Sequence, residues 1–327
     1  MYKNQPDNAQ KVDMPASISQ ETVDNGGKFY VEERERRQQT IIGIVVTIII
    51  MAMIAAIGVT AYQAFYQPQI DVERMQIERS EKAKKQLKKL GAKYKPEVVN
   101  FKGGILISKL GYNKPVAKAP TVATYFDPLC PGCGNFNREA DKTLISMVNA
   151  GQINLEIHPM SFLDKFSAGH YSTRVTGAIM YIASYDNNPQ HLLQFVNSIF
   201  SEEFQPEEGK DQKPVSNEEL IKLAKESGIS DEIASKAFDR KYLKWQSLIN
   251  DCTPDFKELL NVSGTNKGSM TTPTVTINGK LLDINAASDK NMRTIDALLH
   301  CIGLDKNQVG VEGQMPKVSN TDAPIAL

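Results

Sequence analysis

The sequence has no excess of charge of either sign. Its 327 residues include 38 basic and 38 acidic side chains, so the formal net charge is zero. Neutralisation of the phosphate backbone by Lys and Arg dominates nucleic-acid binding, and nothing in this charge balance indicates that function. The length leaves room for one sizeable domain together with additional segments.

Cysteine is scarce, with four residues in the chain. Cys130 and Cys133 form a Cys-x-x-Cys pair, whereas Cys252 and Cys301 stand far apart. Tetrahedral zinc needs two more ligands, usually a second closely spaced pair, which is missing here. Half of a zinc site and an inert structural disulfide remain alternatives, but spacing and context favour a redox-active pair. The even number fits one catalytic and one structural pair in an oxidising compartment.

Charged residues are missing from a long stretch near the N-terminus, because no Asp, Glu, Lys or Arg lies between Arg37 and Asp71. Residues 41–61 are almost wholly apolar, and about 20 apolar residues suffice to cross a bilayer as a helix. The aromatic residues within 62–66 match the belt found at membrane interfaces. The sequence therefore predicts one transmembrane helix over residues 40–66.

The arginines predict the orientation of this helix. Three of them lie within residues 34–37, close to its start, while Arg74 and Arg79 lie farther beyond its other end. The positive-inside rule then places the N-terminus in the cytoplasm and the rest of the chain outside. A signal peptide cleaved after Ala61 is the alternative, but the apolar run is longer than a signal core. In both cases the cysteines face outward.

The segments that flank the main domain are polar. Residues 1–39 show no sustained apolar period and are predicted to form a disordered cytoplasmic tail. Residues 67–97 are predicted to form a charged, solvated stalk and linker, helical over 71–90, because a sustained coiled-coil heptad is missing. Residues 305–327 are predicted to form a flexible C-terminal tail.

The Cys-x-x-Cys pair lies at a predicted strand-to-helix corner. Residues 121–126 are rich in β-branched and aromatic side chains and predict a buried strand. Apolar residues recur at helical spacing from Phe136 onward, and Pro131 suits the first position of that helix. Cys130 would then face the positive end of the helix dipole, which lowers the pKa of a thiol and makes it nucleophilic.

The remaining patterns predict an α/β domain that a helical block interrupts. A strand pattern over 153–159 follows the strand over 121–126 and its helix, which gives a β-α-β unit around the motif and favours a parallel pairing of these two strands. Residues 104–108 are a further short strand candidate. Five segments between about 162 and 262 have helical periods: 168–185, 191–200, 217–227, 231–241 and 244–262. After this block, a strand over 271–277, an Asn-Gly turn and a return strand to Ile284 predict a hairpin, and a helix over 291–302 follows.

This order of elements, with two short motifs, resembles the thioredoxin fold. The motifs are Phe-Asp-Pro-Leu-Cys-Pro-Gly-Cys at 126–133 and Thr-Pro-Thr at 272–274. The helical block over about 162–262 resembles the insertion of the DsbA branch, the extracytoplasmic thiol oxidases. The resemblance covers residues 98–304, and it implies an α/β thioredoxin fold with a large all-helical insertion, preceded by a single transmembrane helix.

The resemblance implies roles for the residues of the first motif. Cys130 is similar to the exposed attacking cysteine of the family, and Cys133 to the buried cysteine that resolves the mixed disulfide. Pro131 and Gly132 lie between them. Several DsbA proteins have a histidine that stabilises the thiolate where this chain has Gly132, so the redox potential is not implied.

The second motif carries a further expectation. Pro273, preceded by Thr272, corresponds to the cis-proline of the family, whose loop faces the disulfide and pairs with a substrate strand. A departure concerns the buried acid that the family often carries six residues before the first cysteine, because this chain has Thr124 there. Asp127 is a candidate substitute for that acid.

Cys252 and Cys301 fall in the last helix of the insertion and in the closing helix. In the fold that the resemblance implies, these segments can approach each other, which predicts a structural disulfide. Closing a loop of roughly 50 residues in this way is worth about 3–4 kcal/mol. Two unpaired buried thiols are the alternative, and neither alternative gives Cys252 or Cys301 a catalytic role.

The resemblance implies a protein dithiol oxidase that donates its Cys130–Cys133 disulfide to reduced secreted or surface proteins. A membrane oxidase, DsbB-like or VKOR-like, would regenerate the disulfide, and no cofactor or metal is implied. The alternatives are an extracytoplasmic reductase or isomerase and a non-enzymatic binding module or chaperone.

Overall fold

The computed structural model describes residues 25–209 and 213–318, which divide into two compact units after Asp71. The first unit contains helix α1 (Asn25–Ala61), the π-helical turn η1 (Tyr62–Tyr66) and the start of α2 (Gln67–Tyr94). Because α1 begins at Asn25, the prediction of a disordered segment over 1–39 is wrong for residues 25–39. The remainder of that segment, residues 1–24, lies outside the described residues.

Helix α1 is long and apolar enough to cross a membrane, as predicted. The large apolar side chains between Ile41 and Val59 are 45–66% exposed. Such a surface is unfavourable in water and suits the interior of a bilayer.

The helix continues through residues 67–70, between the end predicted for the transmembrane helix at residue 66 and the start predicted for the stalk helix at residue 71. Gln67 donates its backbone N–H to the carbonyl of Tyr62, a bond with the five-residue spacing of a π-turn. A π-bulge absorbs an irregularity in the hydrogen-bond ladder of a helix. Pro68 follows directly after this turn. Because proline has no backbone N–H for the hydrogen-bond ladder, the local widening explains why the helix tolerates a proline there.

From Val72 onward α2 belongs to the second unit and is part of the main domain rather than a solvated stalk. Ser80, Ala83 and Leu87 are buried. Near the end of the helix, a Cβ added at Gly91 would lie 2.9 Å from the ring of Trp245. The predicted domain boundary at residue 98 therefore lies too far along the chain, because the apolar positions of α2, sparse as they are, face the core.

The described residues form one six-stranded sheet of order β2-β1-β4-β3-β5-β6. Its strands are β1 (Ile105–Ser108), β2 (Gly111–Tyr112), β3 (Thr121–Phe126), β4 (Asn154–Pro159), β5 (Thr274–Ile277) and β6 (Lys280–Leu281). Strands β3 and β4 are parallel, as predicted, and the other pairs are antiparallel. The two-residue strand β2 was not predicted, since so short a segment has no periodicity.

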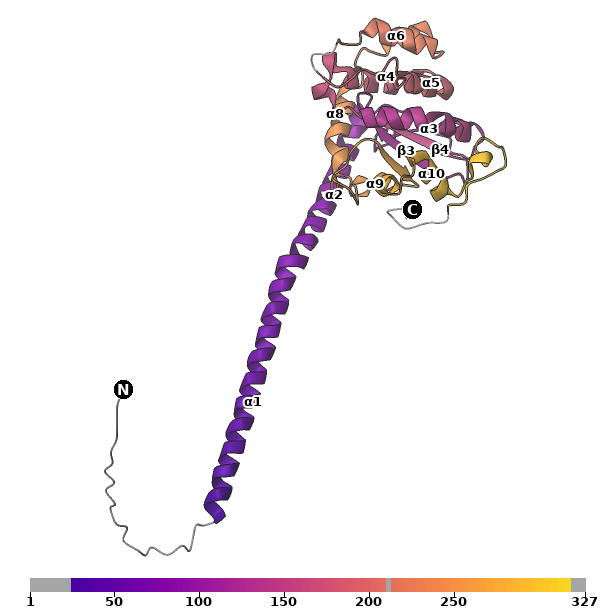
Figure 1. Cartoon of the computed structure of the whole chain (residues 1–327). Coiled ribbons are helices and arrows are strands. Elements are labelled where there is room, and N and C mark those ends of the chain that lie inside the picture. Colours follow the sequence, from indigo (N-terminus) through magenta and orange to yellow (C-terminus); the bar gives the residue numbers. More distant parts are fainter. Residues whose placement is uncertain (1–24, 210–212, 319–327) are drawn as a thin grey trace, which may run out of the picture. The chain divides into compact units, whose positions relative to one another are not determined.

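Helix α3 (Pro131–Asn149) follows β3 and packs on β1 and β4. The predicted all-helical insertion stacks beyond α3, where α4, α5 and α6 form further layers (Figure 1). It comprises α4 (Tyr171–Tyr185), α5 (Pro189–Ile199), α6 (Asn217–Glu226), α7 (Asp231–Lys236) and α8 (Leu243–Cys252). Ser216 caps α6 through a capping box with Glu219.

Two predicted elements end earlier than expected. The helix predicted over 244–262 stops at Cys252, and two 3₁₀ turns, η4 (Thr253–Asp255) and η5 (Lys257–Leu259), follow it. Pro254 explains the stop, because it has no backbone N–H to continue the ladder.

The return strand predicted to reach Ile284 ends at Leu281. Asp283 then accepts a hydrogen bond from the backbone N–H of Ala286 and so caps helix α9 (Ile284–Asp289). An aspartate at this position favours a helix start over a continued strand. The closing helix α10 (Thr294–Ile302) packs against α3.

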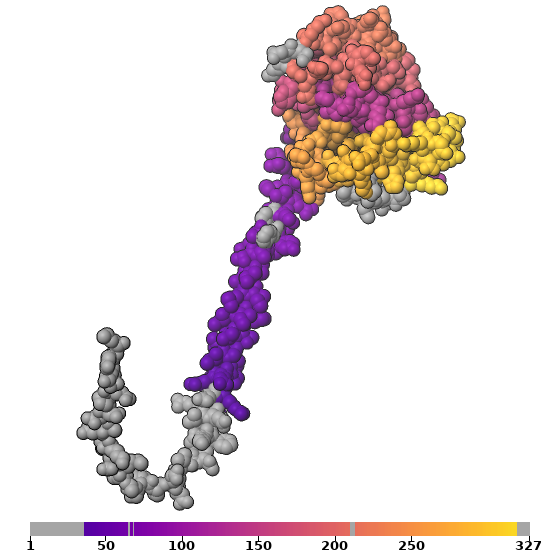
Figure 2. Space-filling view, in the orientation of Figure 1, coloured from indigo at the N-terminus to yellow at the C-terminus, as the bar shows by residue number. Residues whose placement is uncertain are grey.

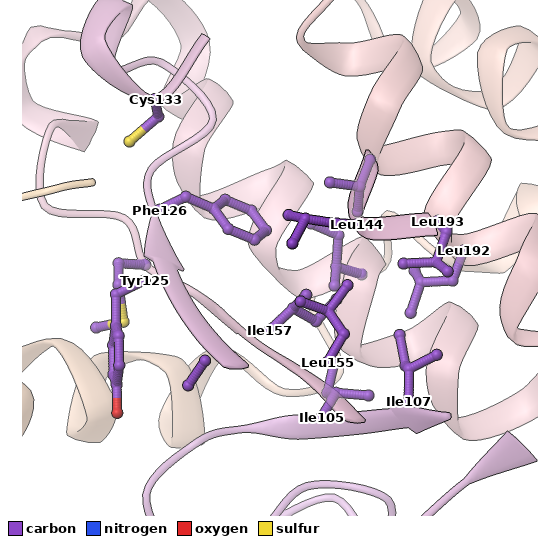
Figure 3. Close-up of a cluster of buried hydrophobic side chains, with 14 of the residues drawn as sticks. Ile105, Ile107, Tyr125, Phe126, Cys133, Leu144, Leu155, Ile157, Leu192 and Leu193 are labelled. Atoms are coloured by element: carbon purple, nitrogen blue, oxygen red, sulfur yellow. The ribbon is translucent and has the colours of Figure 1, made fainter. Parts of the chain in front are cut away.

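One part of the core lies between the sheet and α3. Figure 3 shows Phe126 from β3 beside Leu144 of α3, with Leu155 and Ile157 of β4 and Leu193 of α5 completing the cluster. Tyr125 points away from this cluster, as successive residues of a strand do. Cys133 lies on the other side of Phe126, so the motif rests directly on the core.

The described part of the C-terminal segment is held against the domain, so the predicted flexible tail is wrong for residues 305–318. The Gln152 side chain donates hydrogen bonds to the carbonyls of Gln308 and Gln314 and accepts one from the Gly310 N–H. In the space-filling view this yellow segment lies flush with the surface of the domain (Figure 2). Residues 319–327 lie outside the described part.

The packing of α2 yields a test with two leucines three positions apart. Leu87 is 1% exposed and Leu90 is 38% exposed. We expect Leu87→Ala to destabilise the domain by about 3 kcal/mol, since it removes a buried side chain and leaves a cavity. Leu90→Ala is the matched control, with an effect of at most about 0.5 kcal/mol. Urea unfolding followed by the fluorescence of Trp245, the only tryptophan, measures both. Equal effects would mean that α2 is a solvated stalk.

Candidate active site

The turn between β3 and α3 brings the first cysteine to the start of a helix. Cys130 occupies the N-cap position, with φ −66° and ψ 120°, and Pro131 takes the first helical position as predicted. The Cys130 N–H donates to the Asp127 carbonyl at 3.0 Å, and the Cys130 carbonyl accepts the Gly134 N–H at 3.0 Å. The sulfur therefore lies at the positive end of α3, where backbone N–H groups favour a thiolate.

The two cysteines differ in access. Cys130 is 8% exposed and Cys133 is 0% exposed, while Pro131 and Gly132 are exposed. Cys130 is thus the more accessible sulfur, although the expected exposed cysteine is largely covered. A partner thiol can approach only from the side of Cys130.

The two thiols have opposite pKa shifts. The pKa of Cys130 is lowered to about 6, chiefly by a hydrogen bond with the Cys133 thiol, and further by the N–H groups of Cys133 and Gly132 and the Thr272 side chain, against the effect of burial. Burial, followed by the hydrogen bond and the charge of Cys130, raises the pKa of Cys133 well above its ordinary value. At neutral pH Cys130 is therefore a thiolate and Cys133 a thiol.

The second motif lies against the first. The Thr272–Pro273 peptide bond is cis, as the resemblance implied. The Cys130 thiol lies 3.4 Å from the Thr272 carbonyl oxygen and donates to it when protonated. A Cβ added at Gly132 would lie 3.3 Å from Cδ of Pro273. The fold thus brings together all six residues that the sequence assigns to the site.

Asp127 holds the turn between β3 and α3 in place through hydrogen bonds. Its fully buried carboxylate accepts hydrogen bonds from the Leu129 N–H at 2.9 Å, the Leu163 N–H at 2.8 Å and the Ser172 hydroxyl at 2.6 Å. These donors come from the turn itself, the loop after β4 and helix α4. Burial raises the pKa of Asp127 to about 6, although the three donors oppose this rise.

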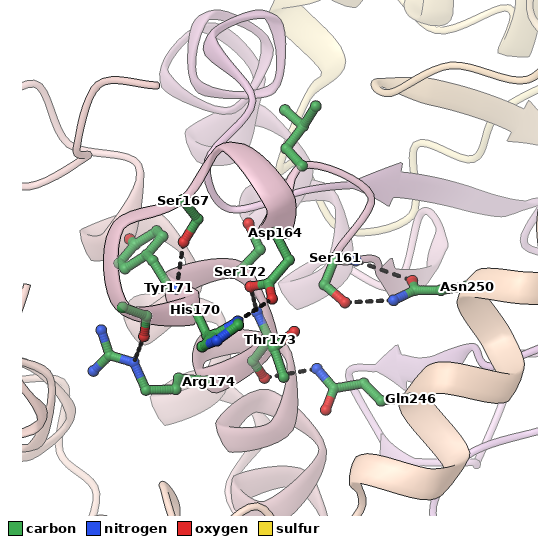
Figure 4. A network of polar contacts seen from close by, with 12 residues as sticks. Ser161, Asp164, Ser167, His170, Tyr171, Ser172, Thr173, Arg174, Gln246 and Asn250 are labelled. Atoms are coloured by element: carbon green, nitrogen blue, oxygen red, sulfur yellow. Dashed lines mark hydrogen bonds and ion pairs between the residues drawn. The ribbon is translucent and has the colours of Figure 1, made fainter. Parts of the chain in front are cut away.

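A polar network extends from this point into the insertion (Figure 4). Asp164, in the loop after β4, accepts hydrogen bonds from the His170 ring and from the Thr173 N–H. The Gln246 amide of α8 donates to the carbonyl of Thr173 at 2.7 Å, and Asn250 binds Ser161. The insertion is thereby joined to the loop that supports Asp127.

Sequence reasoning missed Gln205. Its amide nitrogen donates to the carbonyls of Pro128 at 3.2 Å and Cys130 at 3.0 Å, and its oxygen accepts from Arg138 at 3.0 Å. Gln205 therefore fastens the loop after α5 to the active-site turn. Nothing in the sequence could identify it, because a glutamine in a loop without periodicity carries no positional signal. Burial raises the pKa of Asp141, on α3, to about 8.

Cys252 and Cys301 lie in α8 and α10, outside the site. Both are buried, and burial raises the pKa of each thiol. Within the described ranges no disulfide is formed, so the pairing of Cys252 with Cys301 stays a prediction. In the same ranges no cluster of three or more His, Cys, Asp or Glu side chains is arranged to hold a metal ion.

Several solved structures are similar to this chain. DsbG from Mycobacterium tuberculosis in its reduced form is 24% identical, with a TM-score of 0.44, and the match covers 57% of this chain and 85% of that chain. MdbA, a thiol-disulfide oxidoreductase from Actinomyces oris, is 22% identical, with a TM-score of 0.46 and coverage of 63% and 86%. BdbD from Bacillus subtilis in its oxidised form is 19% identical, with a TM-score of 0.42 and coverage of 62% and 92%.

Sequence comparison adds a family and a partial relative. The serine/threonine-protein kinase PknE of Mycobacterium tuberculosis is 35% identical over 92 residues, which are 28% of this chain and 16% of the kinase. The chain thus matches less than a fifth of the length of that relative. The family model described as thioredoxin matches residues 115–297, which contain both motifs and the insertion. The chain belongs to the thioredoxin family.

Proposed function

We propose that this chain is a membrane-anchored, extracytoplasmic dithiol oxidase that transfers the Cys130–Cys133 disulfide to reduced proteins. The observation that carries the proposal is the division of charge between the two sulfurs, with the pKa of Cys130 lowered to about 6 and that of Cys133 raised. A stable thiolate at the accessible sulfur is both a good leaving group and a reason for the reduced form to be favoured.

The reaction follows from this asymmetry. A thiolate of the substrate attacks Cys130 Sγ of the oxidised pair, the Cys130–Cys133 bond breaks, and Cys133 leaves and takes up a proton. A second substrate thiolate then attacks the substrate sulfur of the mixed disulfide. Cys130 leaves as the thiolate that its surroundings stabilise, and the substrate keeps the disulfide. A membrane oxidase, DsbB-like or VKOR-like, would then take two electrons from the reduced pair and so restore the Cys130–Cys133 disulfide.

The magnitude supports an oxidising role of modest strength. A thiol whose pKa falls from 9.0 to about 6 stabilises the reduced, folded protein by about 1.4 kcal/mol at pH 7, and by more as the pH rises toward 9. For a two-electron couple, about 1.4 kcal/mol corresponds to roughly 30 mV toward a more oxidising potential. Cys133 contributes nothing at pH 7, because its thiol is protonated in the folded and the unfolded chain.

The location is supported by the sequence around α1. The arginines within 34–37 precede the apolar run closely, and the charged residues after it begin only at Asp71, which favours a cytoplasmic N-terminus. The catalytic domain would then lie in the compartment where disulfides persist. Its substrates would be secreted or surface proteins that emerge reduced.

The lowered pKa of Cys130 leads to a prediction about its alkylation. After reduction, iodoacetamide should label Cys130 with a half-maximal rate near pH 6, because the thiolate is the nucleophile. Cys133→Ala should move the midpoint to higher pH, since it removes the largest contribution to the lowered pKa. Peptide mapping assigns the label. A label mainly on Cys133 would reverse the roles of the two sulfurs.

The second prediction tests the direction of the reaction. The full-length protein should oxidise a reduced, unfolded test protein, Cys130→Ser should abolish this activity, and Cys252→Ala should retain it as a control outside the site. Equilibration with glutathione should give a potential between roughly −230 and −120 mV, whereas a value near −270 mV would indicate a reductase. Full function of Cys130→Ser would indicate a binding module.

The third prediction tests the orientation. In intact cells treated with a reductant, a membrane-impermeant maleimide should label Cys130, because the domain after α1 lies outside. A protein without Cys130 is the control for labelling at other cysteines. Labelling that requires cell lysis would place the domain in the cytoplasm and contradict the proposed compartment.

A further inference from the structure

The backbone of the turn that carries Cys130 is bound by two different residues. Asp127 accepts from its donors, because the Asp127 carboxylate binds the Leu129 N–H and the Asp127 carbonyl binds the Cys130 N–H. Gln205 donates to its acceptors, the carbonyls of Pro128 at 3.2 Å and Cys130 at 3.0 Å. Asp127 belongs to the turn itself, whereas Gln205 comes from the helical insertion.

The orientation of the Gln205 amide follows from its other partner. The amide oxygen accepts a hydrogen bond from Arg138 of α3 at 3.0 Å, and a guanidinium group can only donate. Arg138 is itself held in place, because it donates to the Asn135 side chain at 2.6 Å and to the Phe200 carbonyl at 2.9 Å. The amide nitrogen of Gln205 therefore faces the two carbonyls of the turn.

The loop that carries Gln205 is fixed on both sides. Before it, Phe200 is fully buried, and its ring packs edge-on against Phe126 of β3 with the ring centroids 5.5 Å apart. After it, the Gly209 N–H donates to the Phe166 carbonyl at 2.9 Å. Gln205 thus reaches the turn from a position that the rest of the loop already defines.

The glycine after the second cysteine leaves the space that Gln205 fills. A Cβ added at Gly134 would lie 1.9 Å from Oε1 and 2.8 Å from Cδ of Gln205. Gly134 lies near the start of α3, and within a helix glycine is less favourable than alanine. The close approach of the Gln205 side chain gives a physical reason for a glycine at this position.

These contacts bear on the Cys130 sulfur. The sulfur lies at the positive end of α3 only while Cys130 keeps its N-cap backbone, with φ −66° and ψ 120°. A carbonyl oxygen has two acceptor sites, and the Cys130 carbonyl binds the Gly134 N–H at 3.0 Å and the Gln205 amide. The Gln205 donor therefore fixes the cysteine backbone and offsets the negative charge of two carbonyl oxygens in the turn that carries the thiolate.

We propose that Gln205 is a positioning residue for the thiol-disulfide exchange proposed above, and that through it the helical insertion stabilises the thiolate of Cys130. The inference rests on that proposed function. A more stable thiolate favours the reduced form of the pair, so the disulfide is passed on more readily. The insertion is then part of the redox site, because a pair without the Gln205 donor retains its disulfide more strongly.

The substitution that tests this role has to be neutral, because charged side chains surround Gln205. Arg138 binds its oxygen. The side chains that line the same surface groove as Gln205 include Glu203, Glu207, Lys213 and Glu219. Methionine has nearly the length of glutamine and no charge, but it has no hydrogen-bond donor. Gln205→Met therefore removes the donor without a change of charge.

The first measurement is the pH profile of Cys130 alkylation in the reduced, full-length protein in detergent. In Gln205→Met the midpoint should rise by about half a pH unit or more, which is the scale of an interaction at a helix terminus. Gln194→Met is the matched control. Gln194 is an exposed residue of α5 whose amide binds Ser198 of the same helix, and its replacement should leave the midpoint unchanged.

The equilibrium with glutathione measures the same effect independently. At pH 8, Cys130 is ionised in the wild type and in Gln205→Met. A rise of about half a pH unit then shifts the equilibrium about threefold toward the disulfide, because one pKa unit corresponds to about tenfold. A purely structural role of Gln205 would lower the midpoint of urea unfolding and leave both the pH profile and this equilibrium unchanged.

A second variant disturbs the contact while Gln205 stays in the chain. Gly134→Ala places a Cβ in the space of the Gln205 side chain and should raise the alkylation midpoint as Gln205→Met does. In the double variant with Gln205→Ala, the new methyl group enters vacated space, so the midpoint should equal that of Gln205→Ala alone. Additive shifts would contradict the contact, since residues that act through one interaction are not additive.

The proposal would be overturned by an unchanged alkylation midpoint and glutathione equilibrium in Gln205→Met, or by an equal shift in Gln194→Met. If Gln205→Met does not fold, an unchanged midpoint in Gly134→Ala has the same consequence. Loss of all exchange in Cys130→Ser together with no effect of Gln205→Met would leave the proposed function intact and refute only this inference.

Discussion

The site depends on a constraint of electrostatics: two sulfurs that lie side by side, one of them without access to water, cannot both carry a negative charge. Cys133 is fully buried, and its thiol donates to Cys130. The same contact therefore stabilises one thiolate and suppresses the other. Backbone N–H groups at the start of α3 lower the pKa of Cys130 further, and burial is the largest cause that raises the pKa of Cys133.

Much of this could be predicted from the sequence, because the information is local. The Cys-x-x-Cys spacing, Pro131 at the helix start and the β-branched run over 121–126 fix the corner without reference to distant residues. The Asn-Gly turn and the capping box at Ser216 are equally local. The cis-proline was predictable only through the family resemblance, since an isolated Thr-Pro before a strand also suits an ordinary strand start.

The rest could not be predicted, because it depends on which surfaces meet. The charged pattern of α2 indicates a solvated helix, and only the tertiary structure shows that Ser80, Ala83 and Leu87 find a partner surface. Gln205 acts on Cys130 across 75 residues of sequence.

The two perturbed carboxyls bear on how the domain tolerates acid. Burial raises the pKa of Asp127 from 3.8 to about 6 and that of Asp141 to about 8. When the folded pKa of an acid lies above the unfolded value, the unfolded chain ionises first, so stability falls as the pH rises through this range and is regained as it falls. For Asp127 alone the difference amounts to about 3 kcal/mol.

Most folded proteins lose stability in mild acid, because their carboxylates are paired and have lowered pKa values, as Asp296 does beside Arg293 here. Asp127 and Asp141 act in the opposite sense. Beneath its reactive sulfur the domain thus carries its own reserve against acid unfolding.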